Sequence, residues 1–280
     1  MRNNDERSGA RHPGESDAPK MPNPMDFVTP TEFIELPSKG AYYPVGHPLH
    51  NQQTLEIRFM TAKDEDILTS RALLKKGVAL DRLINNLIVD KTINGSSLLI
   101  GDRNAIIIAA RSSAYGHIYE TTVACPACGE KSKNNFDLTE PDTYHGGEFE
   151  DYDIVDHNNG EFSITLPLSK VEVQVKLLNG NDETRLLQNM QRKNKNKNAA
   201  DTNISDQLRT YVVSVNGYKD PKAIRYLIDN ITARDSRYLR NAYSKISPDL
   251  KISDNFECLS CGHEQELEVP FGADFFWPDR

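Results

Sequence analysis

The sequence predicts an α+β fold: a helical body with short antiparallel strands and a zinc ribbon split between two distant parts of the chain. Three observations lead to this expectation. Apolar residues recur every three or four positions in several stretches, which is typical of amphipathic helices. They alternate with polar residues in shorter stretches, which is typical of strands. The four cysteines form two Cys-x-x-Cys pairs that lie far apart in the chain.

The composition argues against several functional classes. The chain has 280 residues, with 33 basic and 41 acidic side chains and a net charge of −8. Nucleic-acid-binding proteins usually carry a basic excess, so we expect no nucleic-acid partner. No apolar run approaches the roughly 18 residues of a membrane span, so we expect no membrane partner. The N-terminal residues lack the apolar core of a secretory signal.

Residues 1–29 are expected to form an N-terminal arm that is disordered or becomes ordered on a partner. Residues 1–26 contain no Leu, Ile, Val, Phe, Trp or Tyr. Such a segment cannot bury enough apolar surface to offset the entropy lost on ordering. Of the two interpretations, the disordered arm is favoured.

Residues 30–116 are expected to form a strand pair followed by a helical segment. Alternating apolar residues predict the strands, near 33–36 and 55–60. The apolar stripe over residues 80–88 predicts an amphipathic helix.

The other two helices of this segment are predicted from their ends. Thr61 and Asp64 resemble a capping box, and we expect one helix to run from there to Gly77, a residue type that suits a helix end. Asp102 is expected to cap a further helix through residues 106–110. That helix is apolar on most sides, so we expect it to be buried.

The two cysteine pairs share one local pattern, and together they predict a metal site. Each pair follows an alternating strand, is followed by a glycine, and leads into a second strand, over residues 117–138 and 250–270. Two such hairpins facing each other supply four thiolates in a tetrahedron, which suits Zn²⁺. The predicted ligands are Cys125, Cys128, Cys258 and Cys261. Gly129 and Gly262 follow the pairs where the chain must turn sharply, which suits a positive φ.

The long interval between the two pairs makes the predicted ribbon unusual. Closing a loop of this length costs on the order of 4 kcal/mol, and a structural zinc ion supplies roughly 10–16 kcal/mol. The metal can therefore join the two hairpins if the intervening chain brings them together. A site with four thiolates has no open coordination position, so we expect it to be structural and not catalytic.

Residues 139–249 are expected to form an α+β insertion whose ends return to the same place. Its acidic first stretch, residues 140–156, is interpreted as a linker or exposed loop. The remaining elements follow from alternation and helical spacing. The expected strands are 162–166 and 171–177, and the expected helices are 181–192, 205–216, 221–231 and 233–246. Asp220 before Pro221 and a capping-box variant at Thr232 indicate where the last two helices begin.

Alternative uses of the metal-binding side chains remain open but are less favoured. A redox Cys-x-x-Cys usually opens a helix, whose N-terminus lowers the thiol pKa, and neither pair here leads into helical spacing. Unlinked thiols are the other alternative. His47 and His50 could bind a metal, although no third ligand is in view. His263 is interpreted as a surface residue beside the ribbon.

Residues 271–280 form an aromatic C-terminal tail that contains the only tryptophan of the chain. Aromatic side chains at a terminus either pack back on the body or anchor a partner. The candidate partner-binding residues are Phe271, Phe275, Phe276 and Trp277. The sequence favours neither use of this tail.

Four stretches resemble the T4-type baseplate hub and hub assembly proteins of contractile-tailed bacteriophages. They are Glu35-Leu36-Pro37-Ser38-Lys39-Gly40-x-Tyr42-Tyr43-Pro44, Phe59-Met60-Thr61-Ala62-Lys63-Asp64-Glu65-Asp66-Ile67-Leu68, the Cys125-Pro126-x-Cys128-Gly129 hairpin, and Phe275-Phe276-Trp277-Pro278. The resemblance is clearest over residues 30–140. It implies a non-enzymatic protein that forms or assembles the central hub of a tail baseplate. Zinc is expected from the cysteines of this chain and is not implied by the resemblance.

The resemblance also implies partners and a location. The partners would be other tail and baseplate proteins, among them hub, tape measure or tube proteins. The protein would act in the virion or in the host cytoplasm during assembly, either as a permanent component or as an assembly chaperone. A zinc-ribbon nucleic-acid-binding protein is the alternative, but glutamates surround the second cysteine pair. A hydrolase or redox enzyme is a third hypothesis, and no catalytic motif supports it.

Overall fold

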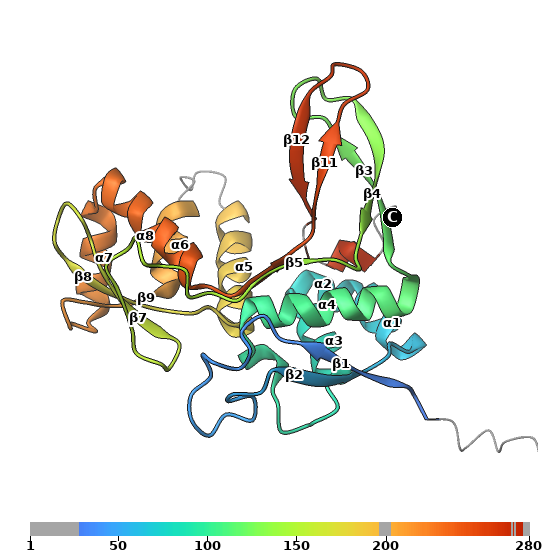
Figure 1. Cartoon of the computed structure of the whole chain (residues 1–280), viewed down its shortest axis with the longest axis horizontal. Helices are drawn as coiled ribbons and strands as arrows, with labels where there is room; N and C mark the ends of the chain where they lie inside the picture. Colours follow the sequence, from blue (N-terminus) through green and yellow to red (C-terminus); the bar gives the residue numbers. More distant parts are fainter. Residues whose placement is uncertain (1–27, 196–202, 270, 272, 277–280) are drawn as a thin grey trace, which may run out of the picture. The chain divides into compact units, whose positions relative to one another are not determined.

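The structure is a computed structural model (Figure 1), and it describes residues 28–195, 203–269, 271 and 273–276. By its internal contacts the chain divides into residues 1–30 and residues 31–280. The predicted arm lies outside the described residues except for its last two positions. The described part is α+β, with eight helices and short antiparallel strands, as predicted. None of its helices has the length and apolar character needed to cross a membrane.

The helices and strands follow one another in mixed order along the chain. The helices are α1 (Ala62–Thr69), α2 (Arg71–Lys76), α3 (Ala79–Leu87), α4 (Ile100–Tyr115), α5 (Gly180–Lys195), α6 (Asn203–Tyr211), α7 (Pro221–Asn230) and α8 (Ala233–Ile246). The strands are β1 (Thr31–Glu35), β2 (Thr54–Arg58), β3 (Ile118–Ala124), β4 (Lys131–Asp137), β5 (Asp142–Tyr144), β6 (Ile154–Asp156), β7 (Glu161–Thr165), β8 (Glu172–Lys176), β9 (Val212–Val215), β10 (Asp249–Lys251), β11 (Ser253–Glu257) and β12 (Glu264–Glu268). Two 3₁₀ turns are η2 (Gly95–Ser97) and η3 (Ala273–Phe276).

The predicted strand pair at the start of the body is confirmed as β1 and β2. They are antiparallel, with Ile34 opposite Leu55, and both of these side chains are buried in the core. Leu36 extends the pairing, because its N–H donates to the carbonyl of Gln53 at 2.8 Å. Period-two burial of apolar residues is the reason why the alternation predicted this pair correctly.

The single helix expected between Thr61 and Gly77 is wrong, because the chain breaks at Ser70. Ser70 has an extended backbone, with φ −67° and ψ 106°, and it ends α1 and begins α2. Serine is disfavoured inside a helix because its hydroxyl can hydrogen-bond to nearby backbone groups in other conformations. The break at Ser70 allows Leu68 to be buried while α2 stays on the surface. The predicted end at Gly77 is confirmed by its left-handed φ of 69°.

Helix α4 is buried as predicted, but Asp102 does not cap it. The helix begins at Ile100, so Asp102 lies inside its first turn. The carboxylate of Asp102 is fully buried and accepts hydrogen bonds from the N–H of Ser38 at 3.0 Å, the hydroxyl of Ser38 at 2.7 Å and the hydroxyl of Tyr43 at 2.7 Å. The prediction failed because the carboxylate binds the loop after β1 instead of the helix backbone.

The insertion contains a four-stranded antiparallel sheet in the order β6-β7-β8-β9. The helix expected over 205–216 is wrong beyond Tyr211, where β9 begins and pairs with β8. Its β-branched valines fit a strand better than a helix. The linker expected over 140–156 is also partly wrong. It contains β5, which pairs with β10, and β6, which joins the sheet.

The last two helices begin where the sequence predicted. Asp220 caps α7 by accepting from the N–H of Lys222 at 2.9 Å, with Pro221 next to it. Thr232 caps α8 by accepting from the N–H of Asp235 at 3.1 Å. The carboxylate of Asp235 does not complete a capping box. It accepts from two N–H groups of the loop between β7 and β8 and thereby ties α8 to the sheet.

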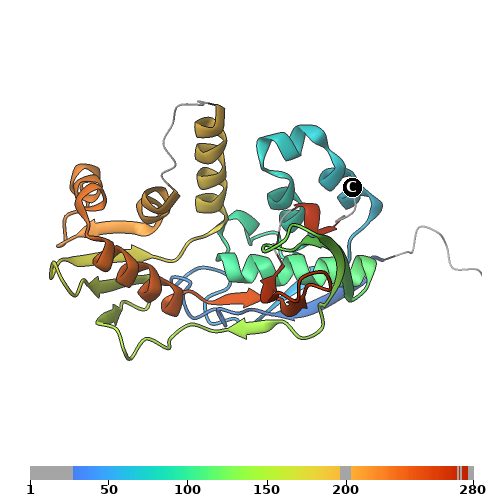
Figure 2. The same ribbon diagram turned by 90° about the horizontal axis from the view of Figure 1, so that it is seen from above.

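The two ends of the insertion come together on α4. β5 follows the first hairpin and pairs with β10, which precedes the second hairpin. β10 runs beside α4 (Figure 2). Gly101 makes this approach possible, because a side chain there would collide with the carbonyl of Pro248. Contacts within the body therefore bring the chain back to the place where the second cysteine pair can meet the first.

Candidate metal centre

The two hairpins that carry the cysteines lie side by side (Figure 1). β3 pairs with β4, and β11 pairs with β12, each in antiparallel register up to the turn. The turns hold Cys125 and Cys128 in one hairpin and Cys258 and Cys261 in the other. The four predicted metal-binding residues thus occupy equivalent places on two similar hairpins.

Both turns have the same backbone geometry. The N–H of Gly129 donates to the carbonyl of Cys125 at 2.8 Å, and the N–H of Gly262 donates to the carbonyl of Cys258 at 2.8 Å. The two glycines have φ values of 77° and 67°. A residue with a side chain rarely adopts this backbone conformation, so the predicted need for glycine at both positions is confirmed.

The four sulfur atoms lie close together. Each pair of sulfurs that faces across the hairpins is almost equally spaced, at 3.7 Å between Cys125 and Cys261 and 3.6 Å between Cys128 and Cys258. All four sulfurs lie within 4.8 Å of one another. A tetrahedron with Zn–S bonds of about 2.3 Å has sulfurs about 3.8 Å apart. The donor set and its spacing therefore fit zinc.

The cluster has a buried and an exposed side. Cys125 and Cys258 are buried and pack with Phe256 in a small apolar cluster of their own, with Val123 and Leu267 beside it. Cys128 and Cys261 are exposed. Apart from Leu267, which also packs against the main core, this cluster shares no residue with the core, so little apolar packing holds the cysteine ends of the hairpins together without the cysteines.

Backbone donors and neighbouring sulfurs set the proton affinities of the thiols in opposite directions. Burial raises the pKa of Cys125, but N–H groups of Cys128 and Ala127 donate to its sulfur and lower the pKa to about 6. The N–H of His263 lowers the pKa of Cys261, but the sulfurs around it raise the pKa to about 12. A metal that binds all four sulfurs would displace the proton of Cys261.

This arrangement can hold a metal ion but offers it no free coordination position. Four thiolates complete a tetrahedral shell, so a bound zinc ion would be structural. No other cluster of three or more metal-binding side chains exists in the described part of the chain. His47 and His50 belong to no such cluster: the Nδ1 of His47 accepts from the N–H of Leu49 at 3.1 Å, and the Nδ1 of His50 lies 2.7 Å from the carbonyl of Tyr43.

The aromatic tail packs on the body in the part that the structure describes. Phe275 and Phe276 are almost fully buried in the main core, at 1% and 2% exposure, and Phe275 lies 4.8 Å from the ring of Tyr119. Phe271 is half-buried and contacts Phe275. Trp277 lies outside the described residues. Of the two uses expected for the tail, packing on the body accounts for Phe275 and Phe276.

One surface feature was not predicted from the sequence. A groove runs along α4, and its floor includes Ala105, Ala109 and Ser112. These small residues recur at helical spacing along one side of α4, and that recurrence is the signal that could have revealed the groove.

Comparison with known proteins shows which family this chain resembles. A family model described as T4 bacteriophage base plate protein matches residues 31–277. The match covers the strand pair, the insertion, both hairpins and the first part of the aromatic tail. No curated protein and no solved structure matches the chain.

Proposed function

This chain belongs to the T4 bacteriophage base plate protein family, and we propose that it forms or assembles the central hub of a phage tail baseplate. It would do so by binding other tail proteins and without catalysis. The observation that carries the proposal is the family match over almost the whole described body. The hub itself is favoured by the resemblance of residues 30–140 to hub proteins. We also propose that a structural zinc ion holds the two hairpins together.

The proposed zinc ion is supported by how little else joins the hairpins. Their shared apolar cluster has only three buried residues, two of which are the cysteines themselves. Their cysteine sulfurs are spaced as a tetrahedral zinc site requires. A metal ion bonded to both hairpins would supply the rigidity that such a small cluster cannot.

The charges on the ribbon argue against the alternative of a nucleic-acid reader. The outer face of the β11–β12 hairpin carries four exposed glutamates, Glu257, Glu264, Glu266 and Glu268. Glu257 and Glu264 lie directly opposite each other in the register. Such a face repels phosphates. Tail proteins, among them hub, tape measure or tube proteins, are the partners we propose.

The function is tested by removing the protein from an infection and then asking where it resides. A nonsense mutation in its gene should prevent complete tails from forming, and supplying the full chain in trans should restore them. Quantitative mass spectrometry of purified virions then distinguishes a permanent baseplate component in the virion from a chaperone that acts in the host cytoplasm. Normal tails in the absence of the protein would refute both versions.

A further inference from the structure

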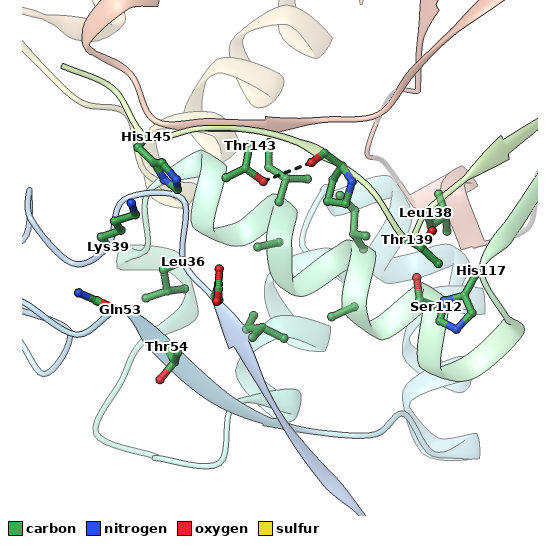
Figure 3. A pocket seen from close by; sticks show the side chains of 17 residues that line it. Leu36, Lys39, Gln53, Thr54, Ser112, His117, Leu138, Thr139, Thr143 and His145 are labelled. Atoms are coloured by element: carbon green, nitrogen blue, oxygen red, sulfur yellow. Dashed lines mark hydrogen bonds between the residues drawn. The ribbon is translucent and has the colours of Figure 1, made fainter. Parts of the chain in front are cut away.

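The groove along α4 is a large hollow for which the proposed function gives no role. Its volume is 650 Å³, and it lies between β1 on one side and residues 138–145 on the other (Figure 3). Ala105, Ile108 and Ala109 of α4 contribute apolar side chains to the floor. His145 closes one end, where its Nδ1 donates to the carbonyl of Pro37 at 3.0 Å.

The edge of β1 that faces this groove is unpaired. Among the described strands, β1 pairs with β2 alone. Leu36 is hydrogen-bonded to Gln53, and hydrogen-bonded pairs alternate along an antiparallel ladder, so Ile34 and Leu55 form the next such pair. The N–H and C=O groups of Phe33 and Glu35 therefore point away from β2. No hydrogen bond to these groups is found among the described residues.

We infer that this groove binds an extended segment of another tail protein, which adds to β1 as a third strand. An unpaired strand edge recognises the backbone of an extended chain, and pockets beside it recognise every second side chain. The floor from Ala105 to Ser112 is about 10 Å long at 1.5 Å per residue, which accommodates about three residues of strand. The small alanines leave room for a large apolar side chain of the bound segment.

The charges at one end of the groove define the segment further. Lys39 and His145 lie near each other there (Figure 3). Lys39 forms no ion pair with any described residue, although Glu35 also lines the groove. A carboxylate on the bound segment would complement Lys39. The expected occupant is thus an extended segment with alternating apolar side chains and an acidic residue at the end that meets Lys39.

This inference deepens the proposed function, on which it rests, by identifying a surface that would hold a tail partner. The test uses the purified full-length protein and a random library of 12-residue peptides. We expect the selected peptides to share alternating apolar residues and one acidic residue. The best peptide is then labelled, and its affinity for each variant is measured by fluorescence anisotropy.

Proline at position 35 tests the backbone contact directly. Glu35→Pro removes an N–H that β2 does not use, and proline is tolerated at such an open edge. Glu35→Gln keeps the N–H and is the matched control. We expect at least tenfold weaker binding for Glu35→Pro, near-normal binding for Glu35→Gln, and melting temperatures close to that of the unmodified protein for both.

A second pair of variants tests the floor of the groove. Ala109→Trp should fill the groove and weaken binding at least tenfold, whereas Ala114→Trp, on an exposed part of the same helix, should not. Lys39→Glu should reduce binding of peptides that carry the acidic residue. These variants keep the inference testable if Glu35→Pro fails to fold.

Several results would overturn the inference. They are an empty selection, selected peptides without alternation, and equal binding by Glu35→Pro and Glu35→Gln. Competition by a peptide of residues 1–29 would show that the chain itself is the occupant, and a dimer that Glu35→Pro dissociates would show a second copy there. Peptide binding does not depend on infection. If it fails while the gene is still needed for tails, the groove inference falls and the proposed function stands.

Discussion

At Asp64, a single carboxylate joins the end of a strand to the start of a helix. It is fully buried and accepts from the guanidinium of Arg58 at 2.7 and 2.9 Å and from the N–H of Thr61 at 2.9 Å. Burial raises the pKa of Asp64, but the donors of Arg58 and Thr61 outweigh it and hold the pKa below its usual value. The folded protein therefore favours the charged carboxylate.

Asp64→Asn should destabilise the protein in a pH-dependent way. At pH 7 the loss of charged hydrogen bonds is expected to cost about 1.5–3 kcal/mol. Because the folded pKa is depressed, this stabilisation is present above the unfolded pKa near 3.9 and is lost as the pH falls through the folded pKa. Urea unfolding at several pH values measures it. The exposed Asp66→Asn serves as control, and an equal loss for both variants would contradict the expectation.

Cys258→Ser tests the proposed metal at a single ligand. The variant should contain less than one zinc ion per chain by atomic absorption, and its melting temperature should fall by about 5 °C or more. Ser260→Ala lies in the same turn, is exposed and supplies no sulfur, so it should retain both zinc and stability. If the unmodified protein contains no zinc, or if Cys258→Ser leaves the melting temperature unchanged, the proposal that a zinc ion holds the two hairpins together is ruled out.

At the scale of the elements, the hairpins and helix ends were the easiest features to predict. Alternation predicted β1, β7 and β8, and capping residues predicted where α7 and α8 begin. The breaks at Ser70 and after Tyr211 had local causes, but one error occurred where a side chain had a partner far along the chain. Asp102 has the sequence context of a helix cap, but its carboxylate binds Ser38 and Tyr43. A local sequence pattern does not indicate such a distant contact.

Metal removal should loosen the two hairpins and leave the rest of the body intact. Near the cysteines the hairpins depend on one small apolar cluster, whereas Tyr119, Phe136 and Val269 at their other ends belong to the main core, which also spans the helices and the four-stranded sheet. Hydrogen exchange with and without a zinc chelator measures this difference. We expect faster exchange over 118–137 and 253–268 and no change in β7 and β8. Uniform protection after chelation would show that the hairpins do not need a metal.

At the scale of the whole molecule, the sequence predicted that the two cysteine pairs come together, but not which contacts bring them together. Two cysteine pairs at a distance imply that the chain returns, and the four sulfurs do lie within 4.8 Å of one another. The pairing of β5 with β10 and the approach of Pro248 to α4 were not predictable. Both depend on contacts between segments that share no sequence pattern.

Gly101→Ala should weaken the packing of the segment before β10 against α4. The added methyl group would collide with the carbonyl of Pro248, and overpacking of this kind typically costs about 1–3 kcal/mol. Thermal unfolding measures the loss, with Ala114→Ser on the exposed face of the same helix as the control. A variant as stable as the control would show that α4 and the segment before β10 move apart without cost.

The split ribbon has a consequence for how the protein is made. During translation the first hairpin leaves the ribosome long before Cys258 and Cys261 are synthesised, and until then it offers a metal ion only two of four ligands. A chain that terminates early could not complete the site. With zinc bound as proposed, the ion would distinguish finished chains from truncated ones before either is incorporated into a tail.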